Sequence, residues 1–262
     1  MPGSTSTRSP EVPQFKAAEF AARIDRARKL MVEQQLDGVV VCSEPNLEYL
    51  SGFRIEFAWN TPTRPWYFAV PLEGEPVAVI PEIGRSSWLI TSWCKNLLTW
   101  ASPRPEDEGV SLLNQVIHEN KRRFGRWGFE TGNETRMGTT ANDLWSIRDA
   151  IAPVEMADAV PVMKALRLVK SKAEIAYLEH VCQLASNTFD NLPGFVKVGD
   201  SEREICRKFR MDHLAQGADQ VPFLAIGTGK GGYHSVISGP TDRRLRDGDI
   251  INIDTGAKYG GY

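Results

Sequence analysis

Short apolar runs alternate with apolar stripes at helical spacing through residues 16–160, and this alternation restricts the fold more than any other feature of the chain. The expected strands are Val39–Cys42, Trp66–Val70, Pro76–Ile80, Leu97–Trp100 and Trp127–Glu130. The expected helices are about Phe15–Gln35, Ser86–Trp93, one marked by Leu113, Val116, Ile117 and Phe124, and one marked by Leu144, Ile147 and Ile151. Alternation of this kind is typical of an α/β domain. Because the short loop 71–75 joins two of the strands, those two should pair antiparallel, which makes the sheet mixed.

After Pro161 the alternation stops. Two helices follow in succession, and each begins with a capping box, in which a Ser is followed three residues later by Glu. The capping boxes are Ser171 with Glu174 and Ser201 with Glu204. We expect the first of these helices to end at Pro193-Gly194. The change of pattern predicts a second domain with a different architecture.

The last third of the chain is rich in glycine and contains one clear strand, Ile250–Asp254. We therefore divide the chain into a disordered tail (1–15), a first domain (16–162) and a second domain (163–262). The pattern G-x-G-x-x-G at Gly227–Gly232 is read as a flexible loop rather than a dinucleotide site, because no helix is expected after it.

Charge and apolar content exclude several classes of protein. The chain has 31 Lys and Arg residues and 33 Asp and Glu residues. It therefore lacks the excess of basic residues that would indicate a nucleic acid as its partner. No apolar run is long enough to span a membrane, and the tail has no apolar core typical of a secretory signal. The four cysteines form no C-x-x-C pair and are expected to be reduced thiols, so we predict a cytoplasmic protein.

Two side chains in the second domain are candidates for chemistry. Asp254 follows apolar residues on a strand that we expect to be buried, where a carboxylate is costly unless it is paired or binds a metal. The alternative is a structural Asp that caps the following turn. His234 lies 20 residues earlier and is either a proton donor or an ordinary loop histidine. The other three histidines, His118, His180 and His213, are expected to be solvated or at the edge of the core.

Aromatic and basic residues are interleaved between Phe57 and Phe68. This segment contains Trp59 and Arg64, which are candidates for substrate contacts. The alternative is that its aromatic residues belong to the core and to an interface between proteins.

Three segments, in this order, resemble the pita-bread metallohydrolases, the family of aminopeptidase P, prolidase and creatinase. They are residues 37–53, residues 166–175 and residues 240–262. The resemblance covers about residues 16–262. It implies a creatinase-like α/β N-terminal domain with a mixed sheet, followed by the first part of an α+β pita-bread catalytic domain.

The resemblance also implies two divalent metal ions, manganese, cobalt or zinc, held by two Asp, one His and two Glu. Asp254 matches the first Asp, and the second is expected eleven residues later, beyond Tyr262. The 262 residues therefore hold one of five expected ligands, and we expect this chain alone to be inactive. The family histidine is expected about 17 residues before the first Asp, at Ile237, so His234 matches only if the loop carries an insertion.

The resemblance favours a dinuclear metal-dependent hydrolase, an X-Pro-type aminopeptidase or dipeptidase acting on small peptides. It also implies a homodimer in which Trp59 and its neighbours close the partner's active site. One alternative is a non-peptidase on the same scaffold, a creatinase-like amidine hydrolase or a lyase with a small nitrogenous substrate. A second alternative is a non-catalytic binding module that lacks the metals.

Overall fold

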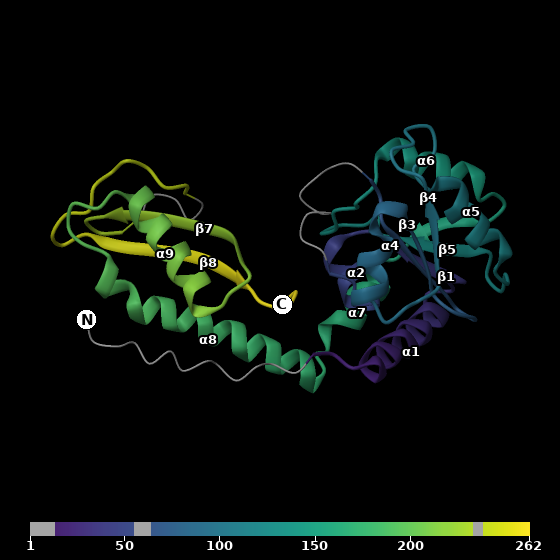
Figure 1. Ribbon diagram of the computed structural model, residues 1–262, viewed down its shortest axis with the longest axis horizontal. Helices are drawn as coiled ribbons and strands as arrows, with labels where there is room; N and C mark the ends of the chain where they lie inside the picture. The colour runs from purple at the N-terminus through teal and green to yellow at the C-terminus, as the bar shows by residue number, and fades with distance from the viewer. Residues whose placement is uncertain (1–13, 55–63, 233–237) are drawn as a thin grey trace. The chain divides into compact units, whose positions relative to one another are not determined.

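A computed structural model describes residues 14–54, 64–232 and 238–262 (Figure 1). The described residues form two compact units, 14–169 and 170–262. The sequence analysis placed the domain boundary at 162/163, which lies inside helix α7 (Val160–Leu168). The disordered tail was expected over residues 1–15, and 1–13 lie outside the described residues. Phe15 is described, and its ring packs edge-on against Phe20.

Residues 14–169 contain a six-stranded sheet in the order β4-β3-β2-β1-β5-β6. The strands are β1 (Gly38–Val41), β2 (Tyr67–Pro71), β3 (Val77–Pro81), β4 (Leu97–Trp100), β5 (Arg126–Phe129) and β6 (Glu155–Asp158). The pairs β1–β2 and β2–β3 are antiparallel, and the other three pairs are parallel. The predicted mixed sheet and the predicted antiparallel pairing of β2 with β3 are therefore confirmed.

Helices cover both faces of this sheet (Figure 1). They are α1 (Ala17–Glu33), α2 (Glu44–Ser51), α4 (Arg85–Thr91), α5 (Val110–Glu119), α6 (Ala141–Ala150) and α7. A short 3-10 helix, η1 (Glu82–Gly84), precedes α4. One buried cluster joins α1, α2, α4 and α7 to one face, and a second joins α5 and α6 to the other. Each buried strand is apolar on both faces for this reason.

Among the described residues of this unit, the elements that were not predicted are α2, β6, α7 and the short 3-10 helix η1. Strand β6 buries only Ala157 of its four residues, so it carries no apolar run in the sequence. Helix α2 is short, and its first turn is supported by a distant carboxylate rather than by a local cap. Phe124 was assigned to the helix that became α5, but α5 ends at Glu119.

That carboxylate belongs to Glu130, which follows β5 and is 1% exposed. It accepts hydrogen bonds from the backbone N–H groups of Cys42 and Ser43 at 2.6 and 2.8 Å. It also accepts from the Ser43 hydroxyl and the Asn46 amide. A negative charge at the N-terminus of a helix is favoured by the helix dipole. Glu130 thereby connects the ends of β1 and β5 to the start of α2.

Residues 170–262 contain helices α8 (Lys172–Phe195) and α9 (Glu202–Gln216) and a two-stranded antiparallel sheet of β7 (Gln220–Gly229) and β8 (Ile250–Lys258) (Figure 1). Both predicted capping boxes are confirmed. The predicted helix end at Pro193-Gly194 is wrong. The Val196 N–H still donates to the Leu192 carbonyl, so the last turn of α8 continues to Phe195.

The strand predictions for this unit were incomplete. Strand β7 was missed, because Pro222 and the glycines at 227 and 229 weaken its strand signal. Strand β8 continues past Asp254 to Lys258, because β7 pairs with it as far as Gln220 opposite Lys258. A small core of Ile205, Cys206, Phe209, Leu224, Ile226 and Leu245 joins α9 to the sheet. None of the helices within the described ranges has the length and apolar character needed to cross a membrane.

The structure predicts that Glu130→Ala destabilises the chain by on the order of 3 kcal/mol, because several buried donors lose their acceptor at once. Urea denaturation followed by tryptophan fluorescence measures this loss. Glu134→Ala is the matched control, because Glu134 is 77% exposed and pairs with the exposed Lys164, and its effect should stay within about 0.5 kcal/mol. Equal urea midpoints for the two variants would contradict the role of Glu130.

Candidate functional site

The two faces of the β7–β8 sheet differ in character. Ile251 and Ile253 on β8 pack with Leu224 and Ile226 on β7 against the core that includes α9. Side chains alternate along a strand, so Asn252 and Asp254 lie on the opposite face of the sheet. Asp254 is paired with Ala225 and is exposed. The expectation of a buried carboxylate was therefore wrong, since the core covers only one face of β8.

Small residues and one aromatic ring surround Asp254 on this face. Ala225 and Gly227 on β7 lie opposite Asp254 and Asn252, and Phe223 lies opposite Gly256. The Phe223 ring covers Gly256 so closely that a Cβ at Gly256 would meet it at 2.7 Å. The sequence analysis missed Phe223, although alternation of Phe223 with Ala225 and Gly227 is a signal for one open sheet face.

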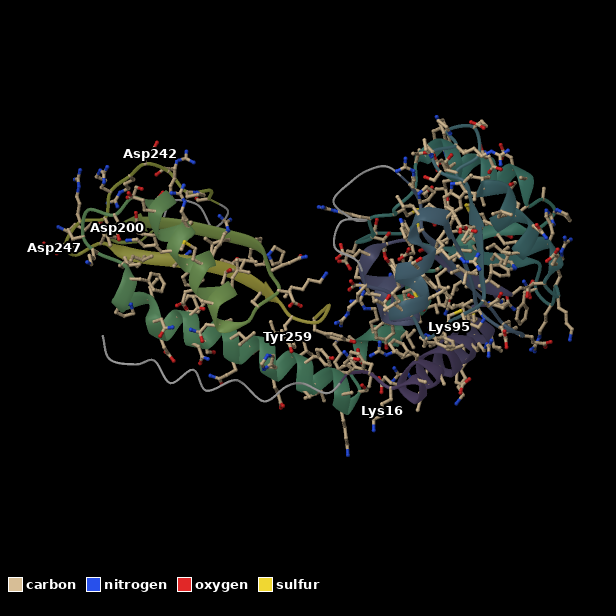
Figure 2. The ribbon with its side chains drawn as sticks, viewed as in Figure 1. Lys16, Lys95, Asp200, Asp242, Asp247 and Tyr259 are labelled. Atoms are coloured by element: carbon tan, nitrogen blue, oxygen red, sulfur yellow. The ribbon has the colours of Figure 1, made fainter. Side chains whose placement is uncertain are left out.

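A turn follows β8 at Tyr259–Tyr262. The N–H of each of these two residues donates to the other's carbonyl, at 2.8 and 3.0 Å. Gly260 and Gly261 between them have φ angles of 60° and 86°, which is the left-handed geometry of a two-residue hairpin turn. The Tyr262 hydroxyl donates to Glu174 Oε1 at 3.1 Å. Figure 2 shows Tyr259 at the opposite end of the sheet from Asp247, which precedes β8.

The described residues do not by themselves form a metal centre. Asp254 is one exposed carboxylate, and no group of three or more His, Cys, Asp or Glu side chains with the spacing of a metal site occurs in the described ranges. Divalent cations in proteins take several ligands. The donor set around Asp254 in the described structure therefore does not fit a divalent ion, and no chemical step is derived from one.

The structure does not place the other predicted site residues relative to Asp254. His234 and Trp59 lie outside the described residues. Arg64 belongs to the unit 14–169, where it is half-buried and its Nε has no hydrogen-bond partner among the described residues. Trp66 and Tyr67, which were interpreted as either substrate wall or core, are 3% and 1% exposed and belong to the core.

The remaining histidines differ from one another. His118 is exposed and lies 3.0 Å from the Ala150 carbonyl, and the ring of His180 packs edge-on against Tyr259. His213 on α9 is 0% exposed, so the expectation of a solvated or core-edge residue was wrong. Neither of its ring nitrogens has a hydrogen-bond partner within the described structure. Burial lowers the pKa of His213, and the nearby Asp212 and the Phe209 backbone only partly oppose this shift.

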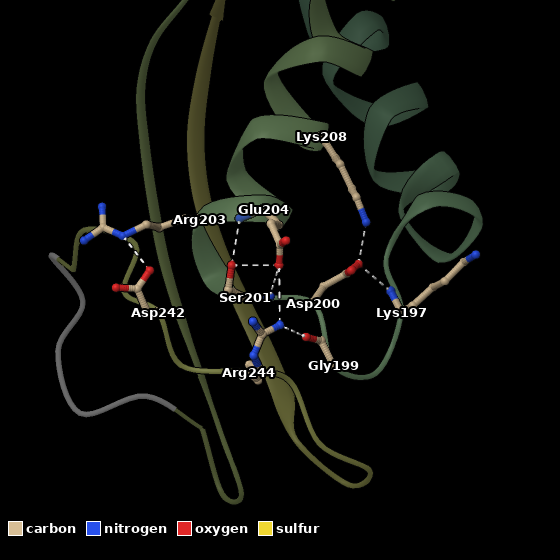
Figure 3. A network of polar contacts seen from close by, with 9 residues as sticks. All are labelled: Lys197, Gly199, Asp200, Ser201, Arg203, Glu204, Lys208, Asp242 and Arg244. Atoms are coloured by element: carbon tan, nitrogen blue, oxygen red, sulfur yellow. Dashed lines mark hydrogen bonds and ion pairs between the residues drawn. The ribbon is translucent and has the colours of Figure 1, made fainter.

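A polar network surrounds the start of α9 (Figure 3). Lys208 donates to Asp200 at 2.6 Å, and this contact holds the pKa of Asp200 below its ordinary value. The Ser201 backbone and side chain likewise lower the pKa of Glu204. Arg244 donates to the Gly199 carbonyl at 2.8 Å, and Arg203 pairs with Asp242 at 3.0 Å. These contacts connect the segment before β8 to the N-terminus of α9.

Each of the two units matches a known protein family. Residues 23–169 match the Creatinase/Prolidase N-terminal domain, and residues 176–262 match metallopeptidase family M24. The chain is 31% identical over 247 residues to the Xaa-Pro dipeptidase of Pyrococcus horikoshii, covering 92% of this chain and 61% of that protein. It is 29% identical over 245 residues to the uncharacterized peptidase YqhT of Bacillus subtilis, covering 92% and 62%.

Among solved structures, the dipeptidase PepE from Mycobacterium ulcerans matches with a TM-score of 0.76 at 23% identity. This match covers 94% of this chain and 62% of that one, and it shows a shared fold. The chain thus spans less than two thirds of the length of these relatives.

The buried His213 predicts a pH dependence of stability. Its folded-state pKa lies below the ordinary value of 6.5, so the unfolded chain binds the proton more readily. The stability that neutral His213 contributes is therefore complete above about pH 6.5 and decreases as the pH falls below it. Urea denaturation between pH 8 and pH 5.5 measures the decrease, and His213→Leu should flatten it. A pH profile of His213→Leu that matches wild type would refute this role, and the exposed His118→Gln serves as the control.

Proposed function

We propose that this chain, which belongs to the creatinase/prolidase family of M24 metallopeptidases, is part of a divalent-metal-dependent peptidase that cleaves X-Pro peptides. The Xaa-Pro dipeptidase and the uncharacterized peptidase described above support a small peptide as substrate. Because the chain spans less than two thirds of these relatives, the activity is assigned to a longer protein that contains these residues.

The observation that carries the proposal is the register of the turn at Tyr259–Tyr262. Tyr259 and Tyr262 form a hydrogen-bonded pair, so a chain continuing beyond Tyr262 would return antiparallel along β8. The Lys258 carbonyl accepts from the Asp219 N–H on the side of β8 that faces β7. Because the backbone groups of successive strand residues point to opposite edges, the N–H and carbonyl of Tyr259 point to the other edge of β8. In this antiparallel register, each residue before Tyr259 on β8 pairs with the residue the same number of positions after Tyr262 on the returning strand. Gly256 would face the third residue after Tyr262.

That third residue is eleven positions after Asp254, where the family resemblance expects a second metal-binding Asp. Gly256 and Asp254 are two residues apart on β8 and share one face of the sheet. The new side chain would therefore lie on the face of Asp254 as its diagonal neighbour, with Cα atoms roughly 7–8 Å apart. Two carboxylates so placed would supply part of the ligand set of the two-metal centre that the resemblance implies, and the chemistry that manganese, cobalt or zinc would supply there is the activation of water.

The proposal includes finer assignments that come partly from the sequence itself and partly from the family resemblance. His234 is the proton donor or substrate contact, Arg64 and Trp59 contact substrate, and the enzyme is a homodimer. A cytoplasmic location is supported by the four cysteines, Cys42, Cys94, Cys182 and Cys206, all of which are unpaired.

A second candidate is a non-peptidase on the same scaffold with a small nitrogenous substrate. The position of the loop histidine favours it. The family histidine is expected at Ile237, whereas this chain has His234 three residues earlier. A shift of this size in the loop would change which substrate the histidine contacts.

The test uses the full-length protein, stripped of metal and reloaded with manganese, cobalt or zinc. We expect hydrolysis of X-Pro dipeptides or of longer X-Pro peptides, and about two metal ions per chain by elemental analysis. Asp254→Asn should reduce activity by at least about 100-fold and lower the metal content, because it replaces an anionic ligand with a neutral one.

Asp242→Asn is the matched control, because Asp242 is 87% exposed and pairs with Arg203 at the surface. Its activity should stay within about twofold of wild type. Turnover of an amidine but not of X-Pro peptides would favour the second candidate. Wild-type activity in Asp254→Asn would sink the assignment of Asp254, and a full-length protein without bound metal or turnover would indicate a binding module.

A further inference from the structure

Phe223 on β7 is a large apolar side chain that the core does not bury. It is 49% exposed, and it does not belong to the core cluster that joins α9 to the sheet. It lies on the open face of the sheet with Asp254, because it pairs with Gly256, two residues after Asp254 on β8. Along β7 it is followed on this face by the small residues Ala225 and Gly227. Its ring is therefore the largest apolar group next to Asp254 on this face.

A β-bulge brings Phe223 to the open face. Between the pairs Gln220–Lys258 and Phe223–Gly256, β7 has two residues where β8 has one. Pro222 is one of the two, and proline suits a bulge because it has no N–H to donate. In a regular pairing Pro222 would lie opposite Gly256. The extra residue shifts the alternation of β7 by one position, so an aromatic ring takes that place. Bulges that redirect a side chain in this way are frequent next to active sites.

The backbone and the ring of Phe223 are both held beside Asp254. The Phe223 carbonyl accepts a hydrogen bond at 3.1 Å from the hydroxyl of Thr255, the residue that follows Asp254. A Cβ added to Gly256 would meet the ring at 2.7 Å, so the ring lies against the bare backbone of Gly256. Phe223 and Asp254 are diagonal neighbours on one face of the sheet, with Cα atoms roughly 7–8 Å apart. At this separation one small ligand can contact both side chains.

Covering Gly256 uses only part of the Phe223 ring. About half of the side chain remains exposed, and it lies beside the candidate metal ligand. An apolar part of a ligand gains free energy when it is buried against such a surface. A carboxylate placed against the ring would lose hydration without gaining a hydrogen-bond partner. The ring therefore distinguishes an apolar group from an anionic one.

We propose that Phe223 is a specificity-determining residue that selects substrates with an apolar group next to the scissile bond. This inference rests on the proposed function, in which Asp254 helps to hold the metals at that bond. The Phe223 ring, one diagonal step from Asp254, contacts an apolar group of a residue that flankes the bond, either a side chain or the proline ring. An anionic side chain in the same place is disfavoured, because the ring offers it no hydrogen bond.

The kinetic test compares Phe223→Ala with Phe189→Ala in the full-length enzyme, with Leu-Pro, Gly-Pro and Asp-Pro as substrates. Phe189 on α8 is the matched control, because it is 41% exposed and packs edge-on against Phe209 rather than on the open face. In Phe223→Ala we expect KM for Leu-Pro to rise about tenfold or more while kcat changes by less than about threefold, which is the pattern of lost apolar binding. Phe189→Ala should stay within about twofold of wild type for every peptide.

The other two peptides identify the group that the ring contacts. A rise in KM that is confined to Leu-Pro assigns the contact to the residue before the bond. An equal rise for all three peptides assigns it to the proline ring, and either result supports the inference. An unchanged KM for all three in Phe223→Ala, a rise for Asp-Pro alone, or equal changes in Phe223→Ala and Phe189→Ala would overturn it.

Gly256→Ala tests the same contact without removing the ring. The new Cβ would meet the ring at 2.7 Å, so the ring has to move. Gly256 is not among the glycines with positive φ, so alanine is compatible with its backbone. We expect KM for Leu-Pro to rise about threefold or more. If Phe223→Ala does not fold, this variant decides the question, and a wild-type KM would then overturn the inference.

A second measurement does not depend on turnover. Calorimetry follows the binding to the full-length protein of a Leu-Pro analogue in which CH₂ replaces the carbonyl of the scissile bond, so that it is not hydrolysed. We expect Phe223→Ala to weaken this affinity about tenfold and Phe189→Ala to leave it unchanged.

The two measurements separate the inference from the proposed function. If wild type hydrolyses no X-Pro peptide while Phe223→Ala weakens binding of the analogue, the proposed function fails and Phe223 remains an apolar ligand contact. If wild type hydrolyses X-Pro peptides and Phe223→Ala matches it in KM and in affinity for the analogue, the inference fails and the proposed function stands. If wild type neither hydrolyses the peptides nor binds the analogue, both fail.

Discussion

The pairing of β7 with β8 forms the only sheet among the described residues of 170–262, and α9 packs against it. Two strands alone are marginally stable in water, so this sheet depends on burying one face against the helices. Ile251, Ile253, Leu224 and Ile226 supply that face. Because side chains alternate, burying these residues leaves Asp254 on the open face. One packing constraint therefore sets both the stability of the unit and the location of its candidate ligand.

Carboxylates at helix N-termini are a second organising feature, and they occur in both units. Glu130 supports the start of α2 from the end of β5. Glu174 completes the capping box of α8 with one oxygen and accepts from the Tyr262 hydroxyl with the other. Glu202 joins α9 to both ends of the segment between β7 and β8. In each case a helix N-terminus is tied to a residue distant in the sequence.

Most elements of the fold were predictable from the sequence, and the exceptions have physical causes. The mixed sheet and both capping boxes have local signals, namely apolar runs, a short loop and Ser-x-x-Glu spacing. The creatinase-like domain followed by part of a pita-bread domain is also confirmed by the family matches and the shared fold. Strand β6 and strand β7 were missed because they carry few buried apolar residues or contain Pro and Gly.

The site was less predictable than the fold. Asp254 was proposed as a ligand from its place at the end of an apolar run, but its exposure depends on which face of β8 the helices cover. In the sequence, Glu202 and Glu130 resemble ordinary charged residues. The hydrogen-bond donors to Glu202 are 26 and 39 residues away, and those to Glu130 are 84 to 88 residues away. Hydrogen bonds between such distant residues have no local pattern.

We propose that the open face of β8 carries a metal centre to which Asp254 contributes a ligand. Anomalous diffraction at the metal absorption edge, from crystals of the full-length protein grown with manganese or zinc, tests it most directly. We expect an anomalous peak about 2.0–2.2 Å from an Asp254 carboxylate oxygen, with further ligands from the returning strand. A metal bound elsewhere, with the Asp254 carboxylate in contact only with solvent, would contradict it.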